Sequence, residues 1–291
     1  MATRTIAQGF STFHTRITPS GYETGKAASH KASITRRLEE YFNLKQLFYS
    51  GSANNGTSIS KHSDVDFFAW IPTDKLKQNS ATSLREIKEC LQSRFPNTSV
   101  YVDSPAVVLD FGSADWDRAE VIPADYVEQK NGKNVYEIPD GSGGWMRSSP
   151  STHTAYVTDE NKRLGKKLKP LIRFLKAWKY YCNVPISSFY LELRATKWME
   201  SESSIVYDID LCTILKKLHS CSLAAIQDPK GISGYVPACA TEAKKADALS
   251  KLATAKTRAE KARQAEKAGK TSEAFDWWNK VFAGNFPSYY Y

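Results

Sequence analysis

Two aspartates separated by a single residue stand at the start of an apolar segment. They are Asp64 and Asp66, and the run Val65–Ile71 has the composition of a strand. Because strand side chains alternate between faces, both carboxylates are expected on one side of a sheet, with their Cα atoms ~7 Å apart. Like charges at that distance repel unless a cation lies between them, and carboxylate oxygens suit Mg²⁺ or Mn²⁺. The pair therefore indicates a divalent-cation site, with an ordinary exposed acidic pair as the competing interpretation.

A glycine and a serine upstream of the aspartates could hold phosphate. Gly51-Ser52 follows the short apolar run Leu47–Tyr49, which suits a strand. Glycine allows a close approach of the backbone, and Ser52 can donate its hydroxyl and its backbone N–H to phosphate oxygens. A phosphate cradle after one strand and a carboxylate pair on the next would form a site for a nucleoside triphosphate. An ordinary turn is the alternative for Gly51-Ser52 considered alone.

The order and spacing of these residues resemble a known signature. The segments Gly51-Ser52, Gly56-Thr57 and Ser63-Asp64-Val65-Asp66 are similar to the motif of the polymerase β-type nucleotidyltransferases. The resemblance implies a two-lobed α+β fold, with an N-terminal mixed sheet and helices and a C-terminal helical lobe. It also implies a third carboxylate on a nearby strand.

Two acidic residues compete for the place of this third carboxylate. The run Ala119–Ala124 resembles the family's third-ligand strand and carries Glu120 where many relatives have Asp. Asp110, at the end of the expected strand Val107–Phe111, is the competitor. If the hairpin turns near Asp115, Asp110 and Glu120 face one another across an antiparallel pair. The predicted catalytic residues and metal ligands are Asp64, Asp66 and Glu120, with Asp110 as the competitor for the third ligand.

Further motifs point to one group within this superfamily. They are Gly143-Gly144-Trp145, Ser149-Pro150, His153, Ile172–Trp178, Ser187-Ser188-Phe189, Leu191-Glu192 and Trp278–Pro287. In this order they resemble the bacterial cyclic-oligonucleotide synthases, the CD-NTases related to cyclic GMP-AMP synthase and oligoadenylate synthase. The resemblance covers most of the chain.

The same resemblance implies that residues of the C-terminal lobe join Gly51 and Ser52 in binding nucleotide. Lys176 would contact the donor triphosphate, and Ser188 would reach the phosphates. Phe189 could stack on a base, a contact that contributes about 1–3 kcal/mol. A solvated helix lysine is the alternative for Lys176, and a core side chain is the alternative for Phe189.

The activity implied by the resemblance is metal-dependent nucleotidyl transfer. ATP or other ribonucleoside triphosphates would be joined into a cyclic di- or trinucleotide second messenger, with Mg²⁺ or Mn²⁺ as the cofactor. A separate effector protein would sense the product in antiphage (CBASS) signalling. Three alternatives stay open: a linear RNA or tRNA-terminal nucleotidyltransferase, an antibiotic nucleotidyltransferase, and a catalytically silent nucleotide-binding module. Base preference, linkage and ring size are not encoded in these motifs.

Composition excludes several other classes of protein. Of 291 residues, 41% are hydrophobic and 12% aromatic, which is enough for a packed core. No apolar run approaches the ~18 residues that span a bilayer. Five scattered cysteines without a Cys-x-x-Cys pair favour a reducing cytoplasm. Most of the net charge of +9 comes from residues 244–270, which contain nine Lys or Arg but only three Asp or Glu. A solvated helix is expected there, and RNA binding is the less favoured alternative.

Strands and helices alternate in the first part of the sequence, and helices dominate the second. Further helices are expected at Ser20–Tyr41, Ser83–Arg94, Leu168–Trp178, Phe189–Ser201, Asp208–Ser222 and Thr241–Trp278, the last with a break at Gly269, and a further strand at Val100–Val102. The glycine-rich loop Asp140–Gly144 suggests a boundary. We therefore predict a nucleotidyltransferase core lobe at residues 1–138 and a helical lobe at residues 139–291.

Overall fold

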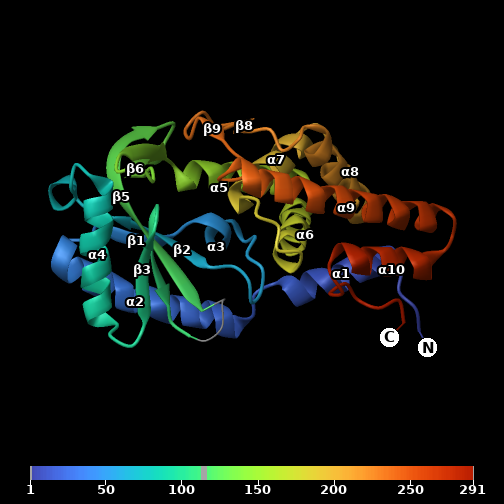
Figure 1. Ribbon diagram of the computed structural model, residues 1–291, viewed down its shortest axis with the longest axis horizontal. Coiled ribbons are helices and arrows are strands. Elements are labelled where there is room, and N and C mark those ends of the chain that lie inside the picture. The colour runs from blue at the N-terminus through green and yellow to red at the C-terminus, as the bar shows by residue number, and fades with distance from the viewer. Residues whose placement is uncertain (1, 113–116, 291) are drawn as a thin grey trace. The chain divides into compact units, whose positions relative to one another are not determined.

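The computed structural model describes residues 2–112 and 117–290 and divides into two compact units (Figure 1). One unit is continuous and spans Pro19–Ala155, whereas the other joins Met1–Thr18 to Tyr156–Tyr291. This division differs from the predicted split at residue 138. The first 18 residues cluster with the C-terminal helices, and residues 139–155 cluster with the sheet. The loop Asp140–Gly144 connects two paired strands, β6 and β7, rather than two lobes.

The continuous unit is built on one mixed sheet. Among the described residues, seven strands form it in the order β1-β2-β5-β4-β3, with β6 paired to β5 and β7 paired to β6. The strands are β1 (Gln46–Tyr49), β2 (Val65–Trp70), β3 (Ser99–Asp103), β4 (Ala106–Asp110), β5 (Arg118–Lys130), β6 (Lys133–Pro139) and β7 (Trp145–Ser148). The neighbours β2 and β5 run parallel, so these two strands start at the same end of the sheet.

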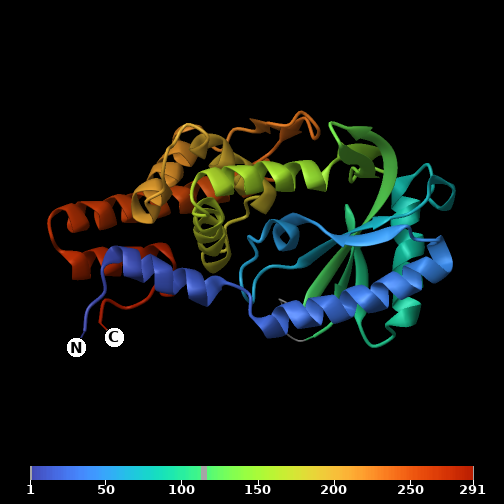
Figure 2. The ribbon, with the colours of Figure 1, turned by 180° about the vertical axis from the view of Figure 1, so that it is seen from behind.

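Two helices cover one face of this sheet, as Figure 2 shows from behind. Helix α2 (Gly21–Phe42) starts at a capping box, in which Ser20 and Glu23 satisfy each other's backbone N–H groups. Its apolar side chains recur at helical spacing and pack with those of α4 (Ser80–Arg94) onto the sheet. The short helix α3 (Gly51–Asn55) and the 3₁₀ turn Thr73–Lys75 lie in the connections on either side of β2.

The opposite face of the sheet is apolar at one end and polar at the other. Phe68 and Ile122 pack there with Tyr136 and Ile138 in a second cluster. Because side chains alternate along a strand, Asp66 points to the same face as Phe68, and Glu120 points to the same face as Ile122. The polar end of this face therefore lies where β2 and β5 begin.

The second unit is mostly helical, as the sequence predicts. Its helices are α1 (Ile6–Ile17), most of α5 (Pro150–Arg163), α6 (Leu168–Tyr181), α7 (Ser188–Met199), α8 (Tyr207–Ser220), α9 (Glu242–Lys267) and α10 (Thr271–Val281), beside the hairpin β8 (Ile226–Gln227) and β9 (Tyr235–Val236). Aromatic rings from both ends of the chain form its core. Phe10 of α1 lies 5.0 Å from Phe174 and 5.1 Å from Trp278, measured between ring centroids.

Together the mixed sheet and the helical unit confirm the predicted α+β class. None of the helices in the described part of the chain is long and apolar enough to cross a membrane. The five cysteines are free thiols.

Candidate active site

Two carboxylates from neighbouring strands meet at the polar end of the sheet. Asp66 of β2 lies directly opposite Glu120 of β5 in the parallel register. Neighbouring strands are about 4.8 Å apart and opposed residues share a face, so the two side chains lie beside each other. Burial raises the pKa of Glu120 to about 7, with further contributions from the charge of Asp66 and from a hydrogen bond between the two side chains. Arg118 opposes this rise. Near neutral pH Asp66 and Glu120 can therefore share one proton. A bound cation would take the place of this proton in balancing the negative charge of the two carboxylates.

Gly51 makes room for the Asp66 carboxylate. It follows β1 and begins α3, and its φ of +49° lies in the left-handed region. A Cβ added at this position would stand 2.1 Å from Asp66 Oδ2. The two segments are held together because the Ser50 N–H donates to the Asp66 carbonyl at 2.9 Å. The sequence predicts a close approach of Gly51 to phosphate, and the structure identifies a close approach to a carboxylate.

Ser52 lies one residue further along α3. Its Oγ is 3.1 Å from Ser58 Oγ, so it is hydrogen-bonded within the loop that leads to β2. The neighbouring Ser50 is buried, and its Oγ has no hydrogen-bond partner among the described residues. Binding of phosphate by Ser52 stays a prediction.

Asp64 lies immediately before β2 and is half-buried. The negative charge of Asp64 acts on Arg118, the first residue of β5. Burial of the Arg118 guanidinium is the largest single influence and works against its charged form. The charges of Asp64, Tyr101, Glu120 and Asp110 together outweigh burial and raise the pKa of Arg118, with Asp64 contributing most among the four. Because such interactions weaken with distance, Asp64 belongs to the group of charges around Arg118 and Glu120.

The position of Asp110 corrects one expectation. Strands β4 and β5 pair antiparallel as predicted, but Asp110 lies opposite Arg118, and Glu120 lies opposite Val108. The expectation that Asp110 and Glu120 face one another is therefore wrong, because the pairing is shifted by two residues. The turn expected near Asp115 lies outside the described residues. Asp110 Oδ1 is 3.4 Å from Arg118 Nε, whereas Glu120 is the carboxylate in register with Asp66.

Arg118 and Tyr101 are members of this charge group that the motifs do not reveal. The Arg118 guanidinium donates to the Tyr101 hydroxyl at 2.5 Å and forms the ion pair with Asp110. One signal in the sequence could have found Arg118, because it precedes Glu120 by two residues on the same strand face. No comparable pattern points to Tyr101, which comes from β3 at the sheet edge.

The three predicted nucleotide-binding residues of the C-terminal part lie in the helical unit. Ser188 accepts a hydrogen bond from Lys179 Nζ at 2.8 Å, and Phe189 is half-buried. Lys176 is fully buried, and its ammonium lies 3.1 Å from Glu192 Oε1 between α6 and α7. This ion pair differs from the predicted contact with a triphosphate, because a lysine with 0% exposure presents no surface to a ligand.

The donor set at the start of β2 and β5 fits a hard divalent cation. Asp66 and Glu120 supply carboxylate oxygens side by side, and the raised pKa of Glu120 reflects negative charge that a cation would neutralise. In the described residues, however, no three His, Cys, Asp or Glu side chains are arranged as a complete metal site. Mg²⁺ is commonly held by one or two protein carboxylates together with substrate phosphates and water, which agrees with this arrangement.

A family model matches more than half of the chain. Residues 4–161 match the Second Messenger Oligonucleotide or Dinucleotide Synthetase domain. A probable cyclic nucleotide synthase of Bacillus cereus is 25% identical over 240 residues, which cover 78% of this chain and 69% of that protein. A cyclic AMP-AMP-AMP synthase of Escherichia coli is 23% identical over 182 residues, which cover 58% of this chain and 56% of that protein.

A solved structure agrees with the fold along the whole chain. The DncV cyclic AMP-GMP synthase of Vibrio cholerae, in complex with a linear intermediate, superimposes with a TM-score of 0.80. The superposition covers 99% of this chain and 98% of that one, at 14% sequence identity. At this identity the likeness concerns the fold alone.

Proposed function

Because the chain belongs to the family of second-messenger oligonucleotide or dinucleotide synthetases, the CD-NTases that its motifs resemble, we propose that it joins ribonucleoside triphosphates into a cyclic di- or trinucleotide. The observation that carries the proposal is the in-register pair Asp66 and Glu120, preceded by Asp64. A silent nucleotide-binding module has no need to keep such charges together. The related synthases from B. cereus, E. coli and V. cholerae support a cyclic product by their names.

The proposed substrates are ATP and other ribonucleoside triphosphates. In each step the acceptor hydroxyl oxygen forms a bond to the α-phosphorus of the donor, the bond to pyrophosphate breaks, and the hydroxyl proton is released. A last step of the same kind closes the ring. Gly51, Ser52, Ser188 and Phe189 are the residues proposed to bind nucleotide. The buried ion pair of Lys176 argues against its direct contact with phosphate.

The proposed cofactor is Mg²⁺ or Mn²⁺, held by Asp64, Asp66 and Glu120. When bound, such a cation makes the acceptor hydroxyl easier to deprotonate and balances the charge of the leaving pyrophosphate. Binding requires Glu120 to lose the proton that its raised pKa retains. Gly51 keeps Asp66 in place by leaving its carboxylate free of a side-chain clash.

Signalling in antiphage defence is the biological role that we propose from the family resemblance. The product would act on a separate effector protein, and the cytoplasm, where nucleoside triphosphates and free thiols are found, would be the compartment. The described helices offer no membrane span that would place the chain elsewhere.

The experiment that tests the proposal is an analysis of reaction products. The purified protein is incubated with the four ribonucleoside triphosphates and Mg²⁺ or Mn²⁺, treated with phosphatase and examined by mass spectrometry. We expect a phosphatase-resistant cyclic product that Asp64→Asn, Asp66→Asn and Glu120→Gln each reduce at least 100-fold. Asp110→Asn is the matched variant, because Asp110 pairs with Arg118, and it should retain most activity.

The other outcomes separate the alternatives. Linear oligonucleotides would favour a linear nucleotidyltransferase, with RNA as a partner. A product made equally by wild type and Asp66→Asn would refute the carboxylate site. If Asp110→Asn abolishes activity and Glu120→Gln retains it, Asp110 rather than Glu120 supplies the third ligand.

A further inference from the structure

The segments that lead into β2 and β5 are each anchored three residues upstream of a candidate metal ligand. Lys61 precedes Asp64 by three residues, and Asp117 precedes Glu120 by three residues. Side chains of α2 hold both segments, although this helix carries none of the candidate ligands. Because one helix holds both segments, its position affects the distance between the candidate metal ligands that follow them.

The first anchor is the Glu23 carboxylate. It accepts the Lys61 backbone N–H at 2.8 Å and the Ser60 hydroxyl at 3.0 Å. The same carboxylate accepts the Ser20 N–H at 2.8 Å in the capping box. Burial works against ionisation of Glu23, but the hydrogen bonds from Ser20, Lys61 and Ser60 outweigh it and lower the pKa. Lys61 adopts a φ of +62°, a conformation that a lysine rarely takes without such support.

The second anchor is the Asp117 carboxylate. It accepts Lys26 Nζ at 2.8 Å on one oxygen and contacts His30 Nε2 at 2.9 Å on the other. Asp117 is 6% exposed, and its carbonyl accepts the Phe111 N–H at 2.9 Å, which closes the start of β5 against the end of β4. The His30 ring stacks on Phe111 at 3.7 Å between centroids. Lys26 and His30 therefore hold the residue before β5 to α2, and the ring contact holds the end of β4 to the same helix.

Glu23, Lys26 and His30 share one side of the helix because their spacing of three and four residues follows the helical repeat. The attachment of α2 to the sheet does not depend on them. Ile34 and Leu38, in the second half of the helix, are fully buried in the core beneath the sheet. Removing an anchor is therefore expected to release a loop without undocking the helix.

We propose that Glu23, Lys26 and His30 are positioning residues that hold the starts of β2 and β5 to one helix and thereby set the spacing of Asp64, Asp66 and Glu120 for a divalent cation. The inference rests on the proposed function. Partners that orient metal ligands typically change metal affinity or activity 10- to 100-fold when they are removed. Because α2 binds the segments before both strands, it fixes the distance between the carboxylates of β2 and β5, which neither strand fixes alone.

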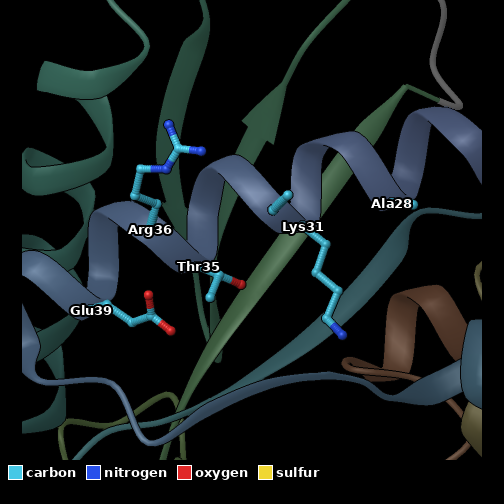
Figure 3. Close-up of a pocket in the computed structure, with 6 residues that line it drawn as sticks. Ala28, Lys31, Thr35, Arg36 and Glu39 are labelled. Atoms are coloured by element: carbon cyan, nitrogen blue, oxygen red, sulfur yellow. The ribbon is translucent and has the colours of Figure 1, made fainter.

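Conservative variants test the two anchors separately. Ser60→Ala and Glu23→Gln weaken the first anchor, and Gln still serves in a capping box. Lys26→Met removes the positive charge that pairs with Asp117 in the second anchor, and Lys26→Arg keeps that charge. Matched controls come from another side of the same helix, where Arg36 and Glu39 line a pocket with Thr35 (Figure 3). Arg36→Met and Glu39→Gln change the same chemical groups in exposed positions.

The readouts are calorimetric titration with Mn²⁺ alone and hydrogen–deuterium exchange of the full chain. We expect Ser60→Ala, Glu23→Gln and Lys26→Met to weaken Mn²⁺ binding about 10-fold. Exchange should increase at residues 59–66 for the first anchor and at residues 117–122 for the second. Lys26→Arg and both controls should bind Mn²⁺ as the wild type does. Where product is formed, kcat should fall while KM for nucleotide changes less than twofold.

Two results would overturn the proposal. One is unchanged Mn²⁺ affinity, within twofold, in a variant whose loop exchanges faster. The other is an equal loss in the Arg36→Met or Glu39→Gln control. The proposed function can fail independently, because a wild type that makes no product but binds Mn²⁺ still permits the comparison of affinities. If the wild type binds no Mn²⁺ and Asp66→Asn leaves every property unchanged, both inferences fall together.

Discussion

At the residue scale, the position of the Asp66 carboxylate depends on the absence of a Cβ atom at Gly51. Gly51 combines a left-handed backbone with an open space that Asp66 Oδ2 fills. Any other residue would add both backbone strain and a clash with the carboxylate. The glycine of the motif therefore has a role in placing a ligand, besides any role that it has toward phosphate.

Gly51→Ala should lower both activity and stability, with the loss of activity going beyond what a strained backbone alone would cause. The new Cβ would displace the Asp66 carboxylate, so we expect at least 100-fold lower product formation and a loss of about 1–3 kcal/mol of unfolding free energy. Gly56→Ala is the matched control, since its φ is +63° and nothing lies within 4 Å of the added Cβ. Product assays and urea unfolding of both variants provide the test. Equal activity in the two variants would contradict this role of Gly51.

The raised pKa of Glu120 predicts a pH dependence of the metal-free protein. In the unfolded chain this carboxyl titrates near 4.5, and in the folded chain near 7. Between these values the folded state retains a proton that the unfolded state has lost, so stability falls as pH rises through this window. At about 1.4 kcal/mol per pKa unit, the loss is at most about 3 kcal/mol.

Urea unfolding in EDTA at pH 5 and pH 8 measures this effect. Glu120→Gln should lose less stability than the wild type between the two pH values, because it has no carboxyl to ionise. The Glu39→Gln variant, changed at an exposed site, should follow the wild type. Parallel curves for wild type and Glu120→Gln would show that Glu120 titrates normally.

At the residue level, a sequence motif singles out Glu120, and the structure places this residue in register with Asp66. The placement of Asp64 beside Asp66 and the roles of the three carboxylates as metal ligands stay predictions. The pairing of Asp110 could not be obtained in this way, because a slip of two residues in the register leaves the hydrophobic pattern intact. Nor does a linear pattern place Tyr101, which reaches Arg118 from an edge strand.

At the element scale, strong periodicity and clear breakers gave the helices and strands that surround the site. The expected helix Ser20–Tyr41 corresponds to α2, and the expected break at Gly269 separates α9 from α10. Strand β5 is much longer than expected, because its second half pairs with β6. Strands β6 and β7 were not predicted, because both are short and mix polar or charged residues with few apolar alternations.

The ion pair between α6 and α7 predicts a structural role for Lys176. Lys176→Met would leave Glu192 buried without this partner, at a cost of about 3–5 kcal/mol of unfolding free energy. The double variant Lys176→Met/Glu192→Met should recover most of that loss, because both charges are gone. Thermal unfolding and product assays on the three proteins test this. We expect the double variant to keep activity within fivefold of the wild type. A stable but inactive double variant would restore the predicted contact with the triphosphate.

At the scale of the whole molecule, the chain leaves the helical unit and returns to it. Residues of α1 pack with α6, α8 and α10, although more than 130 residues separate them in sequence. Local patterns could predict that each helix forms, but they carry no information about which distant helix supplies its partner. The boundary expected at residue 138 therefore followed a glycine-rich loop, whereas the actual division follows the two hydrophobic cores.

A discontinuous unit with its own core predicts a local response to core mutations. Phe10 is fully buried and lies 5.0 Å from Phe286 and 5.1 Å from Trp278, measured between ring centroids. Phe10→Ala should cost about 3–5 kcal/mol, since it leaves a cavity among these rings. The loss should appear as faster hydrogen–deuterium exchange in α6, α8 and α10, with β2 and β5 unchanged. Ile34→Ala, in the core beneath the sheet, should produce the reverse pattern. If both variants accelerate exchange equally in both units, the chain unfolds as one cooperative body, and the division into two cores has no energetic meaning.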